Sequence, residues 1–72
     1  PRAVTTEIKG LAAHVAEGLE TAEDFRSSHM PHLRRYYSQL QTYLFLDGTD
    51  LGLFAILNKG SGEIRFIEVP RD

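Results

Sequence analysis

The segment PHLRRYYSQLQTYLFL, residues 31–46 of the 72-residue chain, is the strongest secondary-structure signal in the sequence. Proline at its start suits the first turn of a helix, and Gly48 just beyond its end suits a left-handed cap. Large side chains recur within it at the helical spacing and form one stripe: Leu33, Tyr37, Leu40 and Leu44. We therefore predict a helix over residues 32–46 that buries this stripe.

Strand-like segments lie on both sides of this helix. Residues 3–9 are rich in β-formers and stop at Gly10, and a period of two places Thr5, Glu7 and Lys9 on one face, with residues 4, 6 and 8 on the other. Residues 51–57 (LGLFAIL) are apolar on both faces, which predicts an interior strand. Residues 58–62 have turn chemistry, and residues 63–69 predict an antiparallel partner that ends at Pro70.

The region between the first strand and the long helix gives a weaker signal. The signal over residues 11–19 is ambiguous, because the alanines favour a helix whereas Gly18 disfavours one. Residues 21–24 (TAED) are typical of a helix cap and predict a short helix through residue 27 or 28.

The order of these segments predicts a single α/β unit of about three strands and one main helix. A strand–helix–strand crossover makes the first two strands parallel, and the last strand returns as a hairpin. One face of the sheet would be covered by the long helix. Because a full α/β layer has helices on both faces, we expect either a larger fold or a homo-oligomer.

Composition is that of an ordinary soluble domain, with 42% hydrophobic and 25% charged residues. No cysteine is present, so disulfides, thiolate zinc sites and cysteine nucleophiles are excluded. No apolar run suggests a membrane span or a signal peptide, and we expect a cytoplasmic protein without a membrane partner. The net charge is −3 over residues 1–24, +3 over residues 25–46 and −2 over residues 47–72, and the basic middle part points weakly to a phosphate-facing segment.

Glu7 and Lys9 form the first candidate constellation. Two residues apart on one strand, they project side by side, so that the carboxylate can hold a divalent metal while the ammonium faces a phosphate. An exposed ion pair explains the same two residues without any chemistry.

The second constellation lies on the long helix. Arg35, Gln39 and Tyr43 are spaced by four and fall along one flank, with Tyr36 beside them. Guanidinium, amide and phenol groups in one row suit a nucleic-acid backbone or an unpaired base. The alternative is the ordinary boundary of an amphipathic helix.

Taken together, the order Glu7-x-Lys9, a helix with Gln39-x-x-x-Tyr43 and an apolar strand resembles the RecB-like and lambda-exonuclease-like (YqaJ-type) branch of the PD-(D/E)XK nuclease superfamily. The segment at residues 31–46 is similar to the helix of its phage and bacterial members. The resemblance covers roughly residues 3–69 and implies a partial restriction-endonuclease-like core.

The resemblance implies a role for each matching residue. Glu7 and the backbone carbonyl of Ile8 would hold Mg²⁺ or Mn²⁺, and Lys9 would place the attacking water. Gln39 and Tyr43 would complete the catalytic site from the helix. Four further residues would contact DNA: His32, Arg34, Arg35 and Tyr36. The function implied is metal-dependent hydrolysis of DNA phosphodiester bonds, as in exonucleases and DNA end processing during phage-type recombination.

One element of the family pattern has no counterpart. In such nucleases an Asp on an earlier strand precedes Glu-x-Lys by ten or more residues, whereas only six residues, none of them acidic, precede Glu7. We expect the 72 residues to be the C-terminal part of a larger nuclease domain in a bacterial or phage-infected cell, and to be inactive alone. The alternatives are a non-catalytic nucleic-acid-binding or assembly module with a degenerate nuclease fold, and a purely structural domain whose tyrosine-rich helix packs on a partner.

Overall fold

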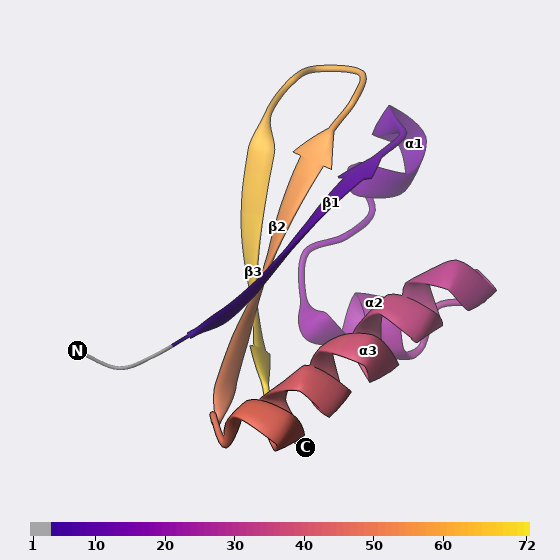
Figure 1. Ribbon diagram of the computed structural model, residues 1–72. Coiled ribbons are helices and arrows are strands. Elements are labelled where there is room, and N and C mark those ends of the chain that lie inside the picture. The colour runs from indigo at the N-terminus through magenta and orange to yellow at the C-terminus, as the bar shows by residue number, and fades with distance from the viewer. Residues whose placement is uncertain (1–3) are drawn as a thin grey trace.

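Within residues 4–72, three strands, one long helix and two short helices make up a small α/β fold. The sequence predicts the three strands, the long helix and the second of the short helices. The computed structural model describes residues 4–72, with the element order β1 (Thr5–Leu11), α1 (Ala13–Ala16), α2 (Ala22–Arg26), α3 (Pro31–Asp47), β2 (Leu51–Asn58) and β3 (Ile64–Pro70). The sheet order is β1-β2-β3, with β1 parallel and β3 antiparallel to the central β2. Figure 1 shows the three helices gathered on one side of this twisted sheet.

Helix α3 has the predicted position. Pro31 occupies its first turn, and Gly48 ends it in the left-handed conformation with φ 67°. Leu33, Leu40 and Leu44 are buried as predicted. Tyr37 is only half-buried, because its hydroxyl reaches the chain end and donates to Asp72 Oδ2 at 2.6 Å.

Strand β1 alternates as predicted but runs further. Thr5, Glu7 and Lys9 are half-buried, whereas Thr6 and Ile8 are exposed. The strand passes through Gly10 to Leu11, whose buried side chain and pairing with Asn58 continue the parallel ladder. The predicted start at residue 3 lies outside the described residues.

Two short helices fill the connection from β1 to α3. Residues 13–16 form α1, in the segment whose sequence favoured neither state. The predicted cap of α2 is confirmed: Thr21 and Asp24 form a capping box, in which the Asp24 carboxylate accepts the backbone N–H of Thr21 at 2.9 Å. Strand β3 includes Pro70 instead of ending before it, which an edge strand tolerates because one row of its N–H groups faces no partner strand.

The core lies between α2, α3 and the covered face of the sheet. Phe25 of α2 stacks on Phe54 of β2, with ring centroids 4.4 Å apart, and both side chains are fully buried. Helix α3 packs tightly over Gly52 of β2, where an added Cβ would lie 3.1 Å from the Cδ2 atoms of both Leu40 and Leu44. Glycine at this position therefore sets the distance between α3 and the sheet.

The opposite face of the sheet carries large apolar side chains that no described element covers. Ile8 is 75% exposed, Phe66 64% and Ile64 59%, and the register places Ile8 and Phe66 on either side of Ala55. Exposed apolar patches of this kind are typical of interaction surfaces or ligand-binding grooves. The sequence-based expectation of an open sheet face is thus met within residues 4–72.

Candidate functional site

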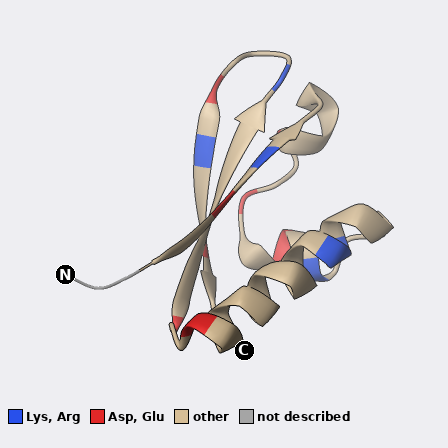
Figure 2. Ribbon diagram, viewed as in Figure 1, with Lys and Arg blue, Asp and Glu red and all other residues tan. Residues whose placement is uncertain are grey.

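Glu7 and Lys9 lie on the face of β1 that turns toward α3. They share this face with Phe54 and Ile56 of β2, their partners in the ladder, which are buried under the helices. The Lys9 ammonium lies 3.9 Å from Glu7 Oε2, and the two side chains are 22% and 27% exposed. Figure 2 shows one acidic and one basic position along β1. A period of two on a strand thus produces a half-buried acid–base pair.

Two contacts fix α3 along β1. At one end, Thr5 Oγ1 donates to Asp47 Oδ2 at 2.9 Å, and at the other the Lys9 ammonium lies 4.4 Å from the ring centroid of Tyr36. The eleven residue steps from 36 to 47 span about 16 Å of helix, and the four steps from 5 to 9 span about 13 Å of strand. The two elements therefore run side by side in opposite directions, as Figure 1 shows.

Glu7 lies midway between these two contacts, opposite the middle of α3. At 100° per residue, Gln39 and Tyr43 fall within about 60° of Tyr36 around the helix, on the flank that meets β1. Both are exposed, and within residues 4–72 neither side chain makes a hydrogen bond or ion pair. The structure thus brings the Glu7–Lys9 pair and the Gln39–Tyr43 flank to the same edge of the molecule, with contact made through Tyr36.

The backbone carbonyl of Ile8 points toward this edge. Leu11 presents its carbonyl on the β2 side, where it accepts the backbone N–H of Lys59 at 2.9 Å. Because carbonyls alternate along a strand, that of Ile8 points away from β2. Strand β1 is the edge strand of the sheet in the described residues, so this oxygen faces no neighbouring strand.

The predicted DNA-contacting residues differ in their surroundings. Arg34 Nη1 donates to the Ser28 carbonyl at 2.6 Å, which ties this guanidinium to the loop before α3. Arg35 is exposed. His32 packs edge-on against Tyr36, with ring centroids 5.7 Å apart and an interplanar angle of 84°. The flank of α3 therefore carries an exposed guanidinium at Arg35 and a packed aromatic pair beside Lys9.

The site supplies part of a magnesium ligand set. Mg²⁺ is commonly held by one or two carboxylates while it keeps several waters, and the carboxylate of Glu7 and the carbonyl of Ile8 match two such positions. Within residues 4–72, no group of three or more His, Cys, Asp or Glu side chains is placed to hold a metal ion. The fit is therefore partial, and it depends on one carboxylate.

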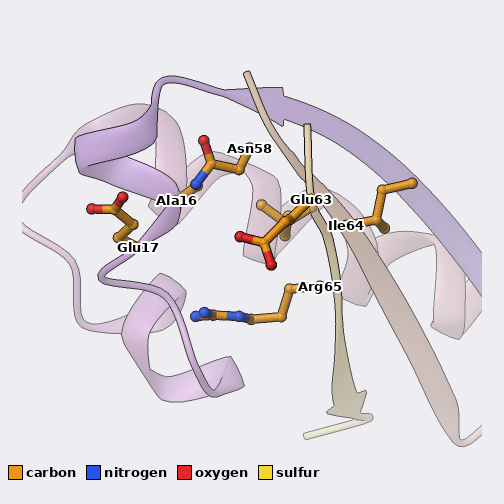
Figure 3. A pocket seen from close by; sticks show the side chains of 7 residues that line it. Ala16, Glu17, Asn58, Glu63, Ile64 and Arg65 are labelled. Atoms are coloured by element: carbon orange, nitrogen blue, oxygen red, sulfur yellow. The ribbon is translucent and has the colours of Figure 1, made fainter. Parts of the chain in front are cut away.

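Two pockets lie elsewhere on the helix side. Figure 3 shows the first, of about 200 Å³, between α1 and the β2–β3 hairpin, with Glu17, Asn58 and Glu63 around it. Arg65 lines it too, but its Nη1 atom is held by the Leu19 carbonyl at 2.6 Å. This pocket is smaller than most ligand sites, which measure about 300–1,000 Å³. None of the predicted site residues lines it.

The second pocket, of about 430 Å³, opens between α1 and the start of α3 and includes His14, His29 and Asp24. The backbone N–H groups of Glu20 and Thr21 lower the pKa of Asp24 below its ordinary value of 3.8. That carboxylate is therefore committed to capping α2.

Sequence reasoning missed the contact of Tyr36 with Lys9 and that of Thr5 with Asp47. The period of two had already placed Thr5 and Lys9 on the face of Glu7. Which helix residues they meet depends on the register between helix and strand, and the sequence carries no signal for it.

No protein-family model matches the chain, and neither the curated proteins nor the solved structures contain a match. In the part of the chain that the structure describes, no helix is both long and apolar enough to cross a membrane.

Proposed function

We propose that this chain is part of a metal-dependent nuclease that hydrolyses DNA phosphodiester bonds, with its site at the edge between β1 and α3. One observation carries the proposal. The half-buried Glu7–Lys9 pair lies against α3, with the Lys9 ammonium 4.4 Å from the Tyr36 ring centroid, and the helical spacing puts Gln39 and Tyr43 on the same flank as Tyr36.

Each group has a role that fits phosphodiester hydrolysis. Glu7 and the Ile8 carbonyl would hold Mg²⁺ or Mn²⁺, and a metal ion there would supply polarisation of a phosphoryl oxygen and a nucleophilic water near neutral pH. Lys9, whose side chain is only partly exposed, would orient the attacking water and offset charge on the phosphate. Gln39 and Tyr43 contact the substrate from the helix, and Arg35 neutralises a backbone phosphate.

A single carboxylate implies that a further acid completes the site. We propose that it comes from another part of a longer nuclease chain, which also covers the open face formed by Ile8, Ile64 and Phe66. Such a protein acts on DNA in the cytoplasm of a bacterial or phage-infected cell, in recombination or end processing. Alternatively, a second copy of the chain in a homo-oligomer covers this open face.

The test is cleavage of labelled DNA by the longest gene product that contains these residues, with and without Mg²⁺. Glu7→Gln and Lys9→Met should each abolish cleavage, by at least about 10²-fold, and leave DNA affinity within a few fold. Matched controls are Glu23→Gln, on a carboxylate paired with Arg26 on α2, and Lys59→Met, on the one other lysine; both should cleave normally.

Two results would contradict the proposal. One is full cleavage by the Glu7→Gln variant. The other is salt-sensitive DNA binding without cleavage under any divalent metal, which would favour a non-catalytic nucleic-acid-binding module that uses Arg35 and its neighbours.

A further inference from the structure

The Lys9 ammonium has two partners of different kinds. On its own strand it meets the Glu7 carboxylate at 3.9 Å, the outer limit of an ion pair, and across the interface it lies over the Tyr36 ring at 4.4 Å from the centroid. Only 22% of the Lys9 side chain is exposed. A cation over an aromatic face at this distance, shielded from much of the solvent, is held about as strongly as by a partly exposed ion pair.

The Tyr36 ring is itself fixed. Tyr36 is half-buried and packs against the core of the molecule. His32, one turn earlier on α3, meets it edge-on at 5.7 Å and 84°. An edge-to-face pair restricts ring orientation, so the face that Tyr36 turns to Lys9 stays in one place.

The two partners of Lys9 respond differently to a divalent cation. A carboxylate that binds a metal directs its charge to the metal and attracts the neighbouring ammonium less. The Tyr36 ring attracts Lys9 through its quadrupole and takes no part in metal ligation, so its attraction persists. We propose that Tyr36 is the positioning residue of this site, which holds the Lys9 ammonium in place when Glu7 is committed to a cation. The catalytic consequence of this role rests on the proposed function, whereas the contact between Lys9 and Tyr36 does not depend on it.

This role also changes what Tyr36 can do with DNA. The ring face that Lys9 covers is closed to a nucleobase, and His32 packs against the same ring. Among the predicted DNA-contacting residues, Arg35 is therefore better placed for the substrate than Tyr36.

The contact is tested by proton NMR on the 72-residue chain, without metal or DNA. The ε-methylene protons of Lys9 should resonate upfield of those of Lys59, the one other lysine and hence an internal control, because they lie over an aromatic ring. Tyr36→Phe should keep the upfield shift, and Tyr36→Leu should lose it. In the wild-type chain, nuclear Overhauser effects should also join the Lys9 ε-protons to the Tyr36 ring protons; this measurement needs no variant to fold. Equal shifts for the two lysines, or no such Overhauser effect, would overturn the proposal.

A second arm uses the cleavage assay and the addition of diamagnetic Mg²⁺ to the NMR sample. With Mg²⁺ at Glu7, the Lys9 ε-protons of the wild type should keep their upfield shift and their Overhauser effects to the Tyr36 ring. In the complete nuclease, Tyr36→Leu should lower kcat by tenfold or more with KM unchanged, and Tyr36→Phe should restore kcat. Wild-type kcat in Tyr36→Leu overturns the positioning role alone. A wild-type protein that cuts no DNA while Lys9 keeps its upfield shift overturns the proposed function instead.

Discussion

The contact of α3 with β2 at Gly52 makes a quantitative prediction about packing. A methyl group added there meets three side-chain carbons, at 3.1 Å from Leu40 Cδ2, 3.1 Å from Leu44 Cδ2 and 3.2 Å from Leu40 Cδ1. Overpacking of this kind costs about 1–3 kcal/mol, and removing glycine from a strand regains about 0.5–1 kcal/mol. Gly52→Ala alone should therefore lower the free energy of unfolding by roughly 1 kcal/mol.

Leu40→Val removes both of the Leu40 carbons that crowd position 52. Alone it should cost about 1–2 kcal/mol, from one buried methylene and a β-branched residue in a helix. In the double variant, the methyl group that Gly52→Ala introduces occupies space that the Leu40 side chain has left. The double variant should therefore be more stable than the sum of the single effects by about 1 kcal/mol.

The assay is urea unfolding followed by circular dichroism on the four proteins of the cycle. A chain of this size has only about 3–5 kcal/mol of stability, so the conservative valine keeps each variant folded and measurable. Leu33→Val is the matched control, since Leu33 is buried on the same helix but supplies none of the three nearest atoms at Gly52. Strict additivity of Gly52→Ala with Leu40→Val would refute the packing described here.

Three further predictions concern stability. The N–H groups of Glu20 and Thr21 lower the pKa of Asp24, so the ionised carboxylate stabilises the fold above about pH 4 and this contribution is lost as the pH falls through the folded-state pKa. Asp24→Asn should therefore lower the urea midpoint at neutral pH. The difference from wild type should vanish in acid. Burial, together with the Asp72 carboxylate, raises the pKa of Tyr37 above 10.0. The contribution of the protonated phenol to folding stability is therefore complete below that pH and is lost as the pH rises through the folded-state pKa. Alkaline titration should destabilise the wild type more than Tyr37→Phe. Gly48→Ala should cost about 1 kcal/mol by thermal unfolding, because φ there is 67°.

Much of the fold follows from local signals that agree with one another. The stripe of leucines in α3, the alternation in β1 and the apolar run of β2 each predict one element, and together they fix the parallel crossover. The capping box of α2 is equally local, since Thr21 and Asp24 are three residues apart. Such features need no knowledge of distant segments.

The features that sequence reasoning missed depend on tertiary register. Tyr37 belongs to the α3 stripe by spacing, but its hydroxyl finds Asp72 at the far end of the chain and stays partly in solvent. The extension of β1 past Gly10 depends on pairing with β2, which comes much later in the chain. For the same reason, the residues of the candidate site were predictable as two separate groups, whereas the link through Lys9 and Tyr36 was not.

The most direct test of the proposed site is paramagnetic relaxation on the isotopically labelled longest gene product that contains these residues, with substoichiometric Mn²⁺ as the probe. If the edge between β1 and α3 holds the cation, the amide signals of Glu7 and Ile8 should broaden first, followed by those of Gln39 and Tyr43 on the facing helix. Broadening centred instead on Glu17 and Glu63, the carboxylates of the hairpin pocket, would contradict the account.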